Sequence, residues 1–257
     1  MISSFRRNVN INFLLNFSGN NGIIVLVILE VIAMKVIARI RTDFKEKFGI
    51  PRQSGLVDSL RARIVFEPKY RVREALRGIE DFSHLWIIWE FSEAKRETWS
   101  PTVRPPRLGG NKRMGVFATR SPFRPNPIGL SSVKLIGIEH SDTEGDVLIV
   151  SGADLMDGTP IYDIKPYLAF TDSHPDAIGG FADEKKGYEA EVIIPDDVAD
   201  GISEEKISEI KDLLREDPRP SYRDDECREY GMSYAGFEIS FMATGSTIEV
   251  TRIEKIK

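Results

Sequence analysis

The residues best suited to chemistry lie in one segment, residues 104–129, which reads RPPRLGGNKRMGVFATRSPFRPNPIG. The chain carries a formal net charge of -5, yet no Asp or Glu occurs from residue 98 to residue 138. Arginines without carboxylate neighbours can bind a phosphate or a carboxylate through two parallel hydrogen bonds. Prolines stiffen the loop and reduce the entropy that it loses on binding. The segment therefore predicts a site for a phosphate backbone or a ligand carboxylate, although a surface loop whose arginines lie over neighbouring strands explains the same residues.

Two shorter polar segments are suited to complete such a site. Pro51, Arg52 and Gln53 form the first, and DLMDGTP, residues 154–160, forms the second. An aspartate-stabilised turn explains the second segment equally well. The residues alone therefore indicate a binding site and name no reaction.

Several other kinds of site are disfavoured by what the sequence lacks. Cys227 is the single cysteine, and the three histidines have no metal-ligand spacing, so we expect no metal site and no disulfide within the chain. Neither a GxGxxG nor a GxxxxGK[ST] loop occurs, which argues against a Rossmann-type methyltransferase or dehydrogenase. No GxSxG elbow occurs either, so serine hydrolase chemistry is disfavoured. The single cysteine is typical of a reducing cytoplasm, where we expect the protein to act.

The elements that must position these residues are mostly strands. Residues 83–92 are rich in aromatic and β-branched side chains and predict a buried central strand, whereas residues 71–80 predict a short helix that ends at Gly78. No βαβ alternation occurs, and closure into a barrel is the usual way for such strands to avoid open edges. The predicted fold class is mainly β, a single-sheet β-barrel with short helices. Its strands are expected at residues 35–41, 62–67, 83–92, 114–118, 131–140 and 146–154, with a hairpin turn at residues 141–145.

The C-terminal residues predict a small α+β unit. Residues 203–217 have an apolar face, a capping Ser203 and two glutamates in the first turn, all typical of a helix. Residues 233–253 alternate in polarity around a Thr-Gly-Ser turn and predict two strands. We therefore expect a β-barrel domain at residues 34–172, a linker at residues 173–194 and an α+β domain at residues 195–257.

The first 33 residues are treated as an N-terminal extension without function. They are rich in asparagine and then apolar, but Glu30 interrupts the apolar run, which is too short to span a membrane. A signal or anchor segment remains an alternative because Arg6 and Arg7 precede the apolar run. We expect Met34 to be the working start.

Five long segments, in this order, resemble the TsaA-like family, the tRNA methyltransferase O group. They read FKEKFGIPRQSGL, FSHLWIIWEF, SPTVRPPRLGGN, RMGVFATRSPFRPNPIGLS and DLMDGTPIYDIKPYL. DPRPSYR, residues 217–223, is similar to a motif of that family's small C-terminal domain. The resemblance implies a homodimer whose β-barrel binds S-adenosylmethionine without a Rossmann fold. The implied reaction is N6-methylation of N6-threonylcarbamoyladenosine at position 37 of threonine-accepting tRNA.

The resemblance also implies which residues contact the cofactor. Matched by position, these contacts are Pro51, Arg52, Gln53, Ser92, Glu93, Arg120, Leu130, Asp154, Leu155, Met156 and Asp157. Asp154 or Asp157 suits the cofactor's amino group or ribose, and Arg52 or Arg120 its carboxylate. We expect none of the histidines to act as a base, because the N6–H of a urea-like threonylcarbamoyl group is more acidic than that of adenine.

Basic and aromatic residues are the candidates for tRNA contact. On the barrel they are Arg104, Arg107, Lys112, Arg113 and Arg124, and on the C-terminal domain they are Arg219, Tyr222 and Arg223. A solvated basic surface explains each of them taken singly. A non-catalytic RNA-binding module is the first alternative function, but it would not need the segments at residues 51–53 and 154–157. A small-molecule methyltransferase on the same barrel is the second, but it would not need the DPRPSYR segment.

Overall fold

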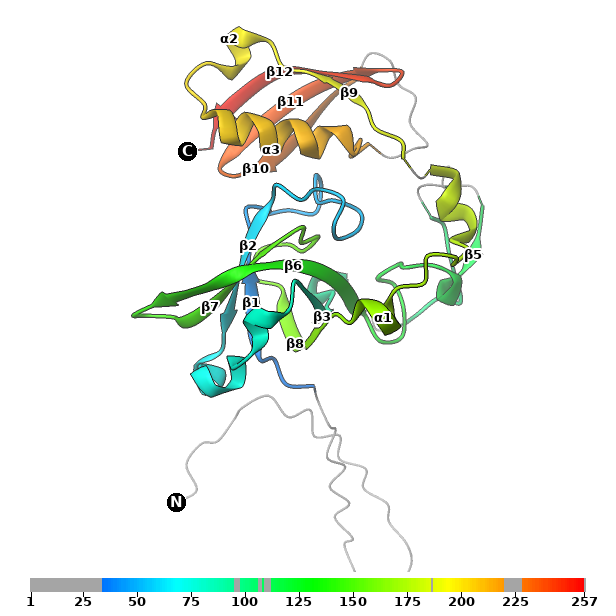
Figure 1. The fold of residues 1–257 in the computed structure, drawn as a ribbon. Helices are drawn as coiled ribbons and strands as arrows, with labels where there is room; N and C mark the ends of the chain where they lie inside the picture. The colour runs from blue at the N-terminus through cyan, green and yellow to red at the C-terminus, as the bar shows by residue number, and fades with distance from the viewer. Residues whose placement is uncertain are drawn as a thin grey trace, which may run out of the picture. The chain divides into compact units, whose positions relative to one another are not determined.

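The computed structural model describes residues 34–94, 98–105, 108, 112–185, 187–219 and 228–256 (Figure 1). The predicted extension at residues 1–33 therefore lies outside the described residues. The chain divides into the units Met1–Lys35 and Val36–Lys257, and every feature below belongs to the second. Among the described residues no helix is long and apolar enough to cross a membrane.

Six antiparallel strands of the described chain form a closed barrel, paired in the order β1-β2-β7-β6-β3-β8 and back to β1. They are β1 (Ala38–Arg41), β2 (Arg61–Phe66), β3 (His84–Glu90), β6 (Ile128–Ser141), β7 (Gly145–Ser151) and β8 (Pro160–Pro166). The turn between β6 and β7 falls where the hairpin was predicted, and Gly145 there has φ +74°, a conformation that favours glycine. The mainly β composition predicted from the sequence is confirmed.

The barrel core is filled by alternate residues of its strands. Leu85, Ile87 and Trp89 of β3 point inward and are buried, while the residues between them are only half-buried. The buried central strand predicted at residues 83–92 is therefore present as β3, which pairs with β6 on one side and β8 on the other and buries alternate residues. Aromatic and β-branched composition did not distinguish a strand buried on one face from one buried on both.

Short 3₁₀ turns replace the helix predicted at residues 71–80. These turns are η1 (Pro68–Tyr70), η2 (Arg73–Leu76) and η3 (Ile79–Asp81). Val72 is extended, with φ −118° and ψ 112°, and separates η1 from η2, so no continuous helix forms before Gly78, where the predicted helix ended. Further short turns of this kind are η4 (Ser92–Ala94), η6 (Val116–Ala118) and η7 (Gly180–Lys185).

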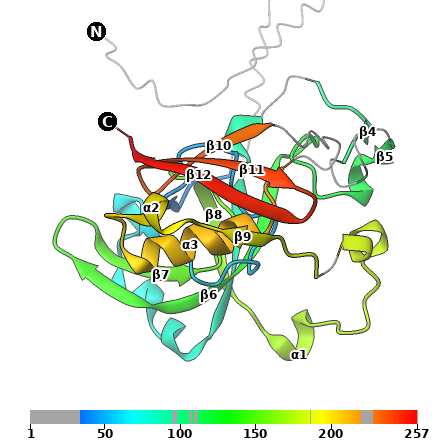
Figure 2. The ribbon, with the colours of Figure 1, turned by 90° about the horizontal axis from the view of Figure 1, so that it is seen from above.

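A two-stranded ribbon is formed by β4 (Thr102–Val103) and β5 (Met114–Gly115), which lie to one side of the barrel strands (Figure 2). Thr102 pairs with Gly115 and Val103 with Met114. The Val116 amide donates to the Pro101 carbonyl at 2.9 Å and extends the pairing by one residue. The strand predicted at residues 114–118 is thus shorter than expected and continues as η6.

The C-terminal region forms a second sheet, ordered β10-β11-β12-β9, with a helix across one face (Figure 1). Its strands are β9 (Glu191–Ile193), β10 (Glu229–Tyr234), β11 (Phe237–Thr244) and β12 (Thr247–Lys255), and its helices are α2 (Asp196–Ala199) and α3 (Glu204–Arg215). The separate helix α1 (Ala169–Asp172) follows the barrel. The Ser203 side chain accepts a hydrogen bond from the Lys206 amide and caps α3, so the predicted helix is confirmed. The predicted strands are also present, and β9 and β10 are additional.

The core of this second sheet includes residues that precede β2 in the chain. Phe44, Val57 and Leu60 belong to the same buried cluster as Ile210 and Phe241. Residues 43–60 therefore serve both parts of the described fold, and residues 51–53 lie within this shared segment.

Candidate functional site

Two loops pack closely at the ends of β2 and β7. The Gly55 amide donates to the Gly152 carbonyl at 2.9 Å. Gly152 has φ +74°, and a Cβ there would lie 3.2 Å from the Gly55 Cα. Only glycine fits this close approach without displacing the backbone, so the segment around residues 51–55 is fixed against the start of the segment at residues 152–157.

Asp154 is held at this junction by a chain of buried side chains. The Trp89 indole donates to the Ser131 hydroxyl at 2.9 Å, and that hydroxyl donates to Asp154 Oδ1 at 2.6 Å. Ser131 is only 1% exposed. Burial raises the pKa of Asp154, while the Ser131 hydrogen bond, the backbone amides of Asp154 and Ser54 and the charge of Arg120 oppose that rise.

Arg120 joins the proline-rich loop to the same junction. Its guanidinium donates to the Gln53 side-chain carbonyl, and its charge acts on Asp154. The Ser54 hydroxyl accepts from the Ser132 amide at 3.1 Å and ties residues 51–54 to β6. Three segments far apart in the sequence, around Gln53, Arg120 and Asp154, are thus brought together.

Several other predicted cofactor residues have different surroundings. Arg52 donates to the carbonyls of Asp217, at 3.0 Å, and Arg219, at 2.7 Å, and so braces a turn of the C-terminal region. Asp157 pairs with Lys45 at 2.7 Å. The Leu155 side chain is buried in the barrel core, which leaves only its backbone to meet a ligand.

Among the described residues, the remaining predicted cofactor residues form no hydrogen bond or ion pair with Gln53, Arg120 or Asp154. Pro51 is buried, whereas Leu130 is exposed on the outer side of β6. Ser92 and Glu93 lie in η4, where the Glu93 carbonyl accepts from Lys47 Nζ at 3.3 Å. The Met156 carbonyl accepts from the Thr159 hydroxyl at 2.7 Å. The structure thus brings together Gln53, Arg120 and Asp154 more closely than the other predicted residues.

The predicted tRNA contacts on the barrel fall into two groups. Arg104, Lys112 and Arg113 are exposed, and Arg113 also donates to the Thr102 hydroxyl at 3.1 Å. Arg124 is half-buried and donates to backbone carbonyls of its own loop at 3.4 and 3.5 Å. The remaining predicted contacts Arg107, Tyr222 and Arg223 lie outside the described residues.

Arg219, a predicted tRNA contact, forms hydrogen bonds within the C-terminal region. It forms two hydrogen bonds of 2.8 Å with the Asp217 carboxylate and a third of 3.0 Å with the Gly245 carbonyl. Its side chain is only 11% exposed. Asp217 has φ 45°, and this left-handed turn folds its carboxylate back onto a residue two positions later. Arg219 therefore stabilises the fold, a role that a count of basic residues does not reveal.

Trp89, Ser131 and Ser54 belong to the junction and were missed from the sequence. One signal was available for Ser131, because it falls at an inward position of β6 that alternates with exposed Leu130. A hydroxyl at an inward position needs a buried partner. Gly129 belongs to the same junction, since a Cβ there would overlap the Trp89 ring.

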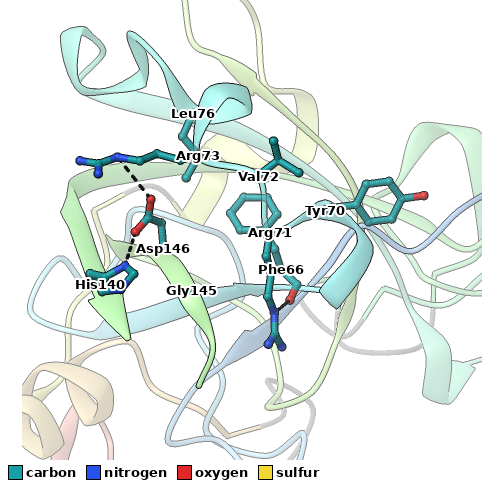
Figure 3. Close-up of a pocket in the computed structure, with 9 residues that line it drawn as sticks. All are labelled: Phe66, Tyr70, Arg71, Val72, Arg73, Leu76, His140, Gly145 and Asp146. Atoms are coloured by element: carbon teal, nitrogen blue, oxygen red, sulfur yellow. Dashed lines mark hydrogen bonds and ion pairs between the residues drawn. The ribbon is translucent and has the colours of Figure 1, made fainter. Parts of the chain in front are cut away.

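A cavity of about 170 Å³ lies elsewhere, between η1, η2 and the β6–β7 hairpin (Figure 3). His140 Nδ1 lies 2.7 Å from one oxygen of Asp146, and the Arg73 guanidinium lies 3.8 Å from the other. None of the predicted site residues lines this cavity. Among the described residues, no cluster of three or more His, Cys, Asp or Glu is suited to hold a metal ion.

The models of two protein families match the chain. The tRNA-methyltransferase O N-terminal domain matches residues 39–173, and the TrmO C-terminal domain matches residues 199–256.

Curated relatives and solved structures agree with this match. The chain is 44% identical over 226 residues to the tRNA (adenine(37)-N6)-methyltransferase of Escherichia coli, covering 84% of this chain and 94% of that protein. It is 40% identical over 211 residues to a putative S-adenosylmethionine-dependent methyltransferase of Pseudomonas aeruginosa, covering 76% of this chain and 86% of that protein. A crystal structure of TrmO from P. aeruginosa superposes with a TM-score of 0.71 at 32% identity, covering 88% of this chain and 98% of that one. This chain is therefore a member of the tRNA-methyltransferase O family.

Proposed function

We propose that this chain transfers a methyl group from S-adenosylmethionine to N6 of adenine 37 in tRNA. The name of the E. coli relative supports the reaction, and the name of the P. aeruginosa relative supports the methyl donor. The observation that carries the proposal for this chain is the convergence of Gln53, Arg120 and Asp154 at one junction.

The residues at this junction fit the chemistry of S-adenosylmethionine. Its amino-acid tail carries a carboxylate and an ammonium group, and its ribose carries two hydroxyls. Arg120 is exposed and offers a guanidinium to the carboxylate, while Asp154 offers an acceptor to the ammonium group or the ribose. Arg52 is less suited than Arg120, because it already donates to two carbonyls of the C-terminal region.

The junction also limits the motion of these groups. Ser131 fixes one oxygen of Asp154, and the Trp89 indole fixes Ser131, so the carboxylate is oriented before any ligand arrives. Methyl transfer is an in-line displacement, in which a bond from N6 to the methyl carbon forms as the bond from sulfur to that carbon breaks. Holding the reacting groups in line supplies a large part of the rate, roughly 7–11 kcal/mol in well-oriented systems.

The proton on N6 does not require a dedicated histidine in this proposal. His84 Nδ1 lies 2.9 Å from the Ser83 hydroxyl, and His140 pairs with Asp146 in the cavity of Figure 3. An N6-threonylcarbamoyl group makes the N6–H more acidic, so water can accept the proton. We therefore propose N6-threonylcarbamoyladenosine in threonine-accepting tRNA as the substrate.

The parts of the chain have separate proposed roles. Residues 34–172 bind the cofactor and residues 195–257 contribute to tRNA binding, in a homodimer that acts in the cytoplasm. The family resemblance supports the dimer, and sedimentation of the full chain at micromolar concentration tests it.

The function is tested by incubating the full chain with methyl-labelled S-adenosylmethionine and threonine tRNA, made with and without the threonylcarbamoyl group. Mass spectrometry of the digested nucleosides should find the label on N6 of adenine 37, and only in the tRNA that carries threonylcarbamoyl. A tRNA with guanine in place of adenine 37 should remain unlabelled. Binding of tRNA without any methyl transfer would instead indicate a non-catalytic RNA-binding module. Methylation of the free nucleoside as fast as of tRNA would indicate a small-molecule methyltransferase.

A further inference from the structure

Two large aromatic side chains lie exposed beside the β4–β5 ribbon. Trp99 is 52% exposed and Phe117 is 73% exposed, and their ring centroids are 6.0 Å apart with 33° between the ring planes. Val116 bonds to Pro101 across the ribbon, which brings the residues on either side of that bond close together. The pairing of the two backbone segments therefore positions the rings beside each other.

Exposed aromatic rings gain free energy when a partner covers them. Single exposed hydrophobic residues are common on protein surfaces, but a paired and backbone-positioned set is typical of a binding surface. These two rings offer a flat, apolar partner a place to stack.

The charge around the pair indicates what kind of partner fits. Arg104 and Arg113 are both exposed and lie next to the paired residues at the end of the ribbon opposite to Trp99 and Phe117. No Asp or Glu occurs from residue 98 to residue 138. A ligand with a flat ring at one end of the ribbon and negative charges towards the other end matches this arrangement, and a single strand of RNA has both properties.

The pair also lies close to the proposed methyl-transfer site along the chain. Phe117 precedes Arg120 by three residues, so their Cα atoms are separated by at most about 11 Å. Arg120 in turn donates to Gln53 and acts on Asp154. If one base stacks on the pair and another base lies at the junction, only a few nucleotides need to separate the two bases.

We propose that Trp99 and Phe117 form a stacking subsite for an unpaired nucleobase next to the target adenine of the anticodon loop. The inference rests on the proposed function, because it assumes that the RNA approaches the junction of Gln53, Arg120 and Asp154. The subsite holds the flanking base, and Arg104 and Arg113 at the other end of the ribbon hold phosphates further along the same strand.

The test measures binding of a fluorescent anticodon stem-loop RNA to the full chain and to W99A, F117A and the double variant. Base–aromatic stacking is worth about 1–3 kcal/mol per base, so each loss should weaken binding about 5- to 150-fold. F117Y should bind like the parent protein, because tyrosine keeps the aromatic face. Affinity for S-adenosylmethionine should be unchanged in every variant. The three variants should also keep the parent melting temperature, since both rings are exposed.

A second RNA, abasic at the nucleotides that flank adenine 37, distinguishes stacking from other effects. The parent protein should bind this RNA as weakly as the double variant binds the intact RNA, and the double variant should lose little more. Intact affinity in the double variant would overturn the inference, as would an equal loss on intact and abasic RNA. Dissociation of a dimer by W99A or F117A would also overturn it, since a second copy of the chain would then be the occupant. Absence of methyl transfer by the parent protein would contradict the proposed function instead, and the stacking result would still be read from binding.

Discussion

Replacing Ser131 by alanine tests how the protein holds Asp154. The variant removes the 2.6 Å hydrogen bond to the Asp154 carboxylate and also the acceptor for the Trp89 indole. A hydrogen bond to a charged group contributes about 1.5–3 kcal/mol, and a buried donor left without a partner costs about 1–3 kcal/mol. The side chains around residue 131 can relax and offset part of these two losses. We therefore expect S131A to reduce the free energy of unfolding by roughly 2–4 kcal/mol at neutral pH.

The size of this loss should depend on pH in a defined direction. Burial already raises the pKa of Asp154, so the folded state holds its proton to higher pH than the unfolded state. The unfolding free energy therefore falls as pH rises from the unfolded pKa through the folded one. Removing Ser131 removes an interaction that lowers the pKa, which moves the folded pKa further up and widens this window. The deficit of S131A should thus be largest above the folded pKa of Asp154 and should shrink in acid.

Urea denaturation at a series of pH values measures this effect, with S132A as the matched control. Ser132 is the next residue of β6, and its contribution to Ser54 comes from the backbone amide, which alanine retains. We expect S132A to stay close to the parent protein at every pH. Equal stability of the two variants at neutral pH would refute the account of Asp154, and a deficit of S131A that does not change with pH would refute the assignment to its carboxylate.

Three further outcomes follow from the packing and the charges. G129A should lower the melting temperature, since overpacking costs about 1–3 kcal/mol and a Cβ at Gly129 would overlap the Trp89 ring; a parent-like melting curve would contradict this. R219A should destabilise the C-terminal region because it breaks the pair with Asp217, and a loss of tRNA affinity at unchanged stability would instead indicate a direct RNA contact. Tyr162 should remain protonated at pH 11 in a spectrophotometric titration, because burial and a neighbouring glutamate raise its pKa to about 12, and ionisation near pH 10 would contradict the packing around it.

The sequence predicted those parts of the fold that depend on local signals. The α3 helix begins where Ser203 caps it, and the β6–β7 hairpin turns where Gly145 adopts a positive φ. The short helix predicted to end at Gly78 did not form, because the extended backbone of Val72 breaks the segment into separate 3₁₀ turns despite the helix-forming residues around it. Local signals also did not distinguish one-sided from two-sided burial of β3.

The candidate site could be predicted only in part, because its geometry depends on contacts between distant segments. The resemblance supplied Gln53, Arg120 and Asp154, but not the buried Ser131 that orients the carboxylate. Arg219 was predicted as a tRNA contact, and its ion pair with Asp217 two positions earlier could not be read from residue type. Residue type gives the chemistry that a side chain can perform, whereas its partners decide whether it is available.

The central claim is that Arg120 and Asp154 hold S-adenosylmethionine at the junction of the three segments. Titration calorimetry of S-adenosylmethionine into the full chain and into R120A and D154N tests it most directly, with R104A as a control from the same acid-free segment. The parent protein and R104A should bind alike, and each loss of a charge-assisted contact should weaken binding about 10- to 150-fold. Parent-like affinity in both R120A and D154N would contradict the claim and place the cofactor elsewhere.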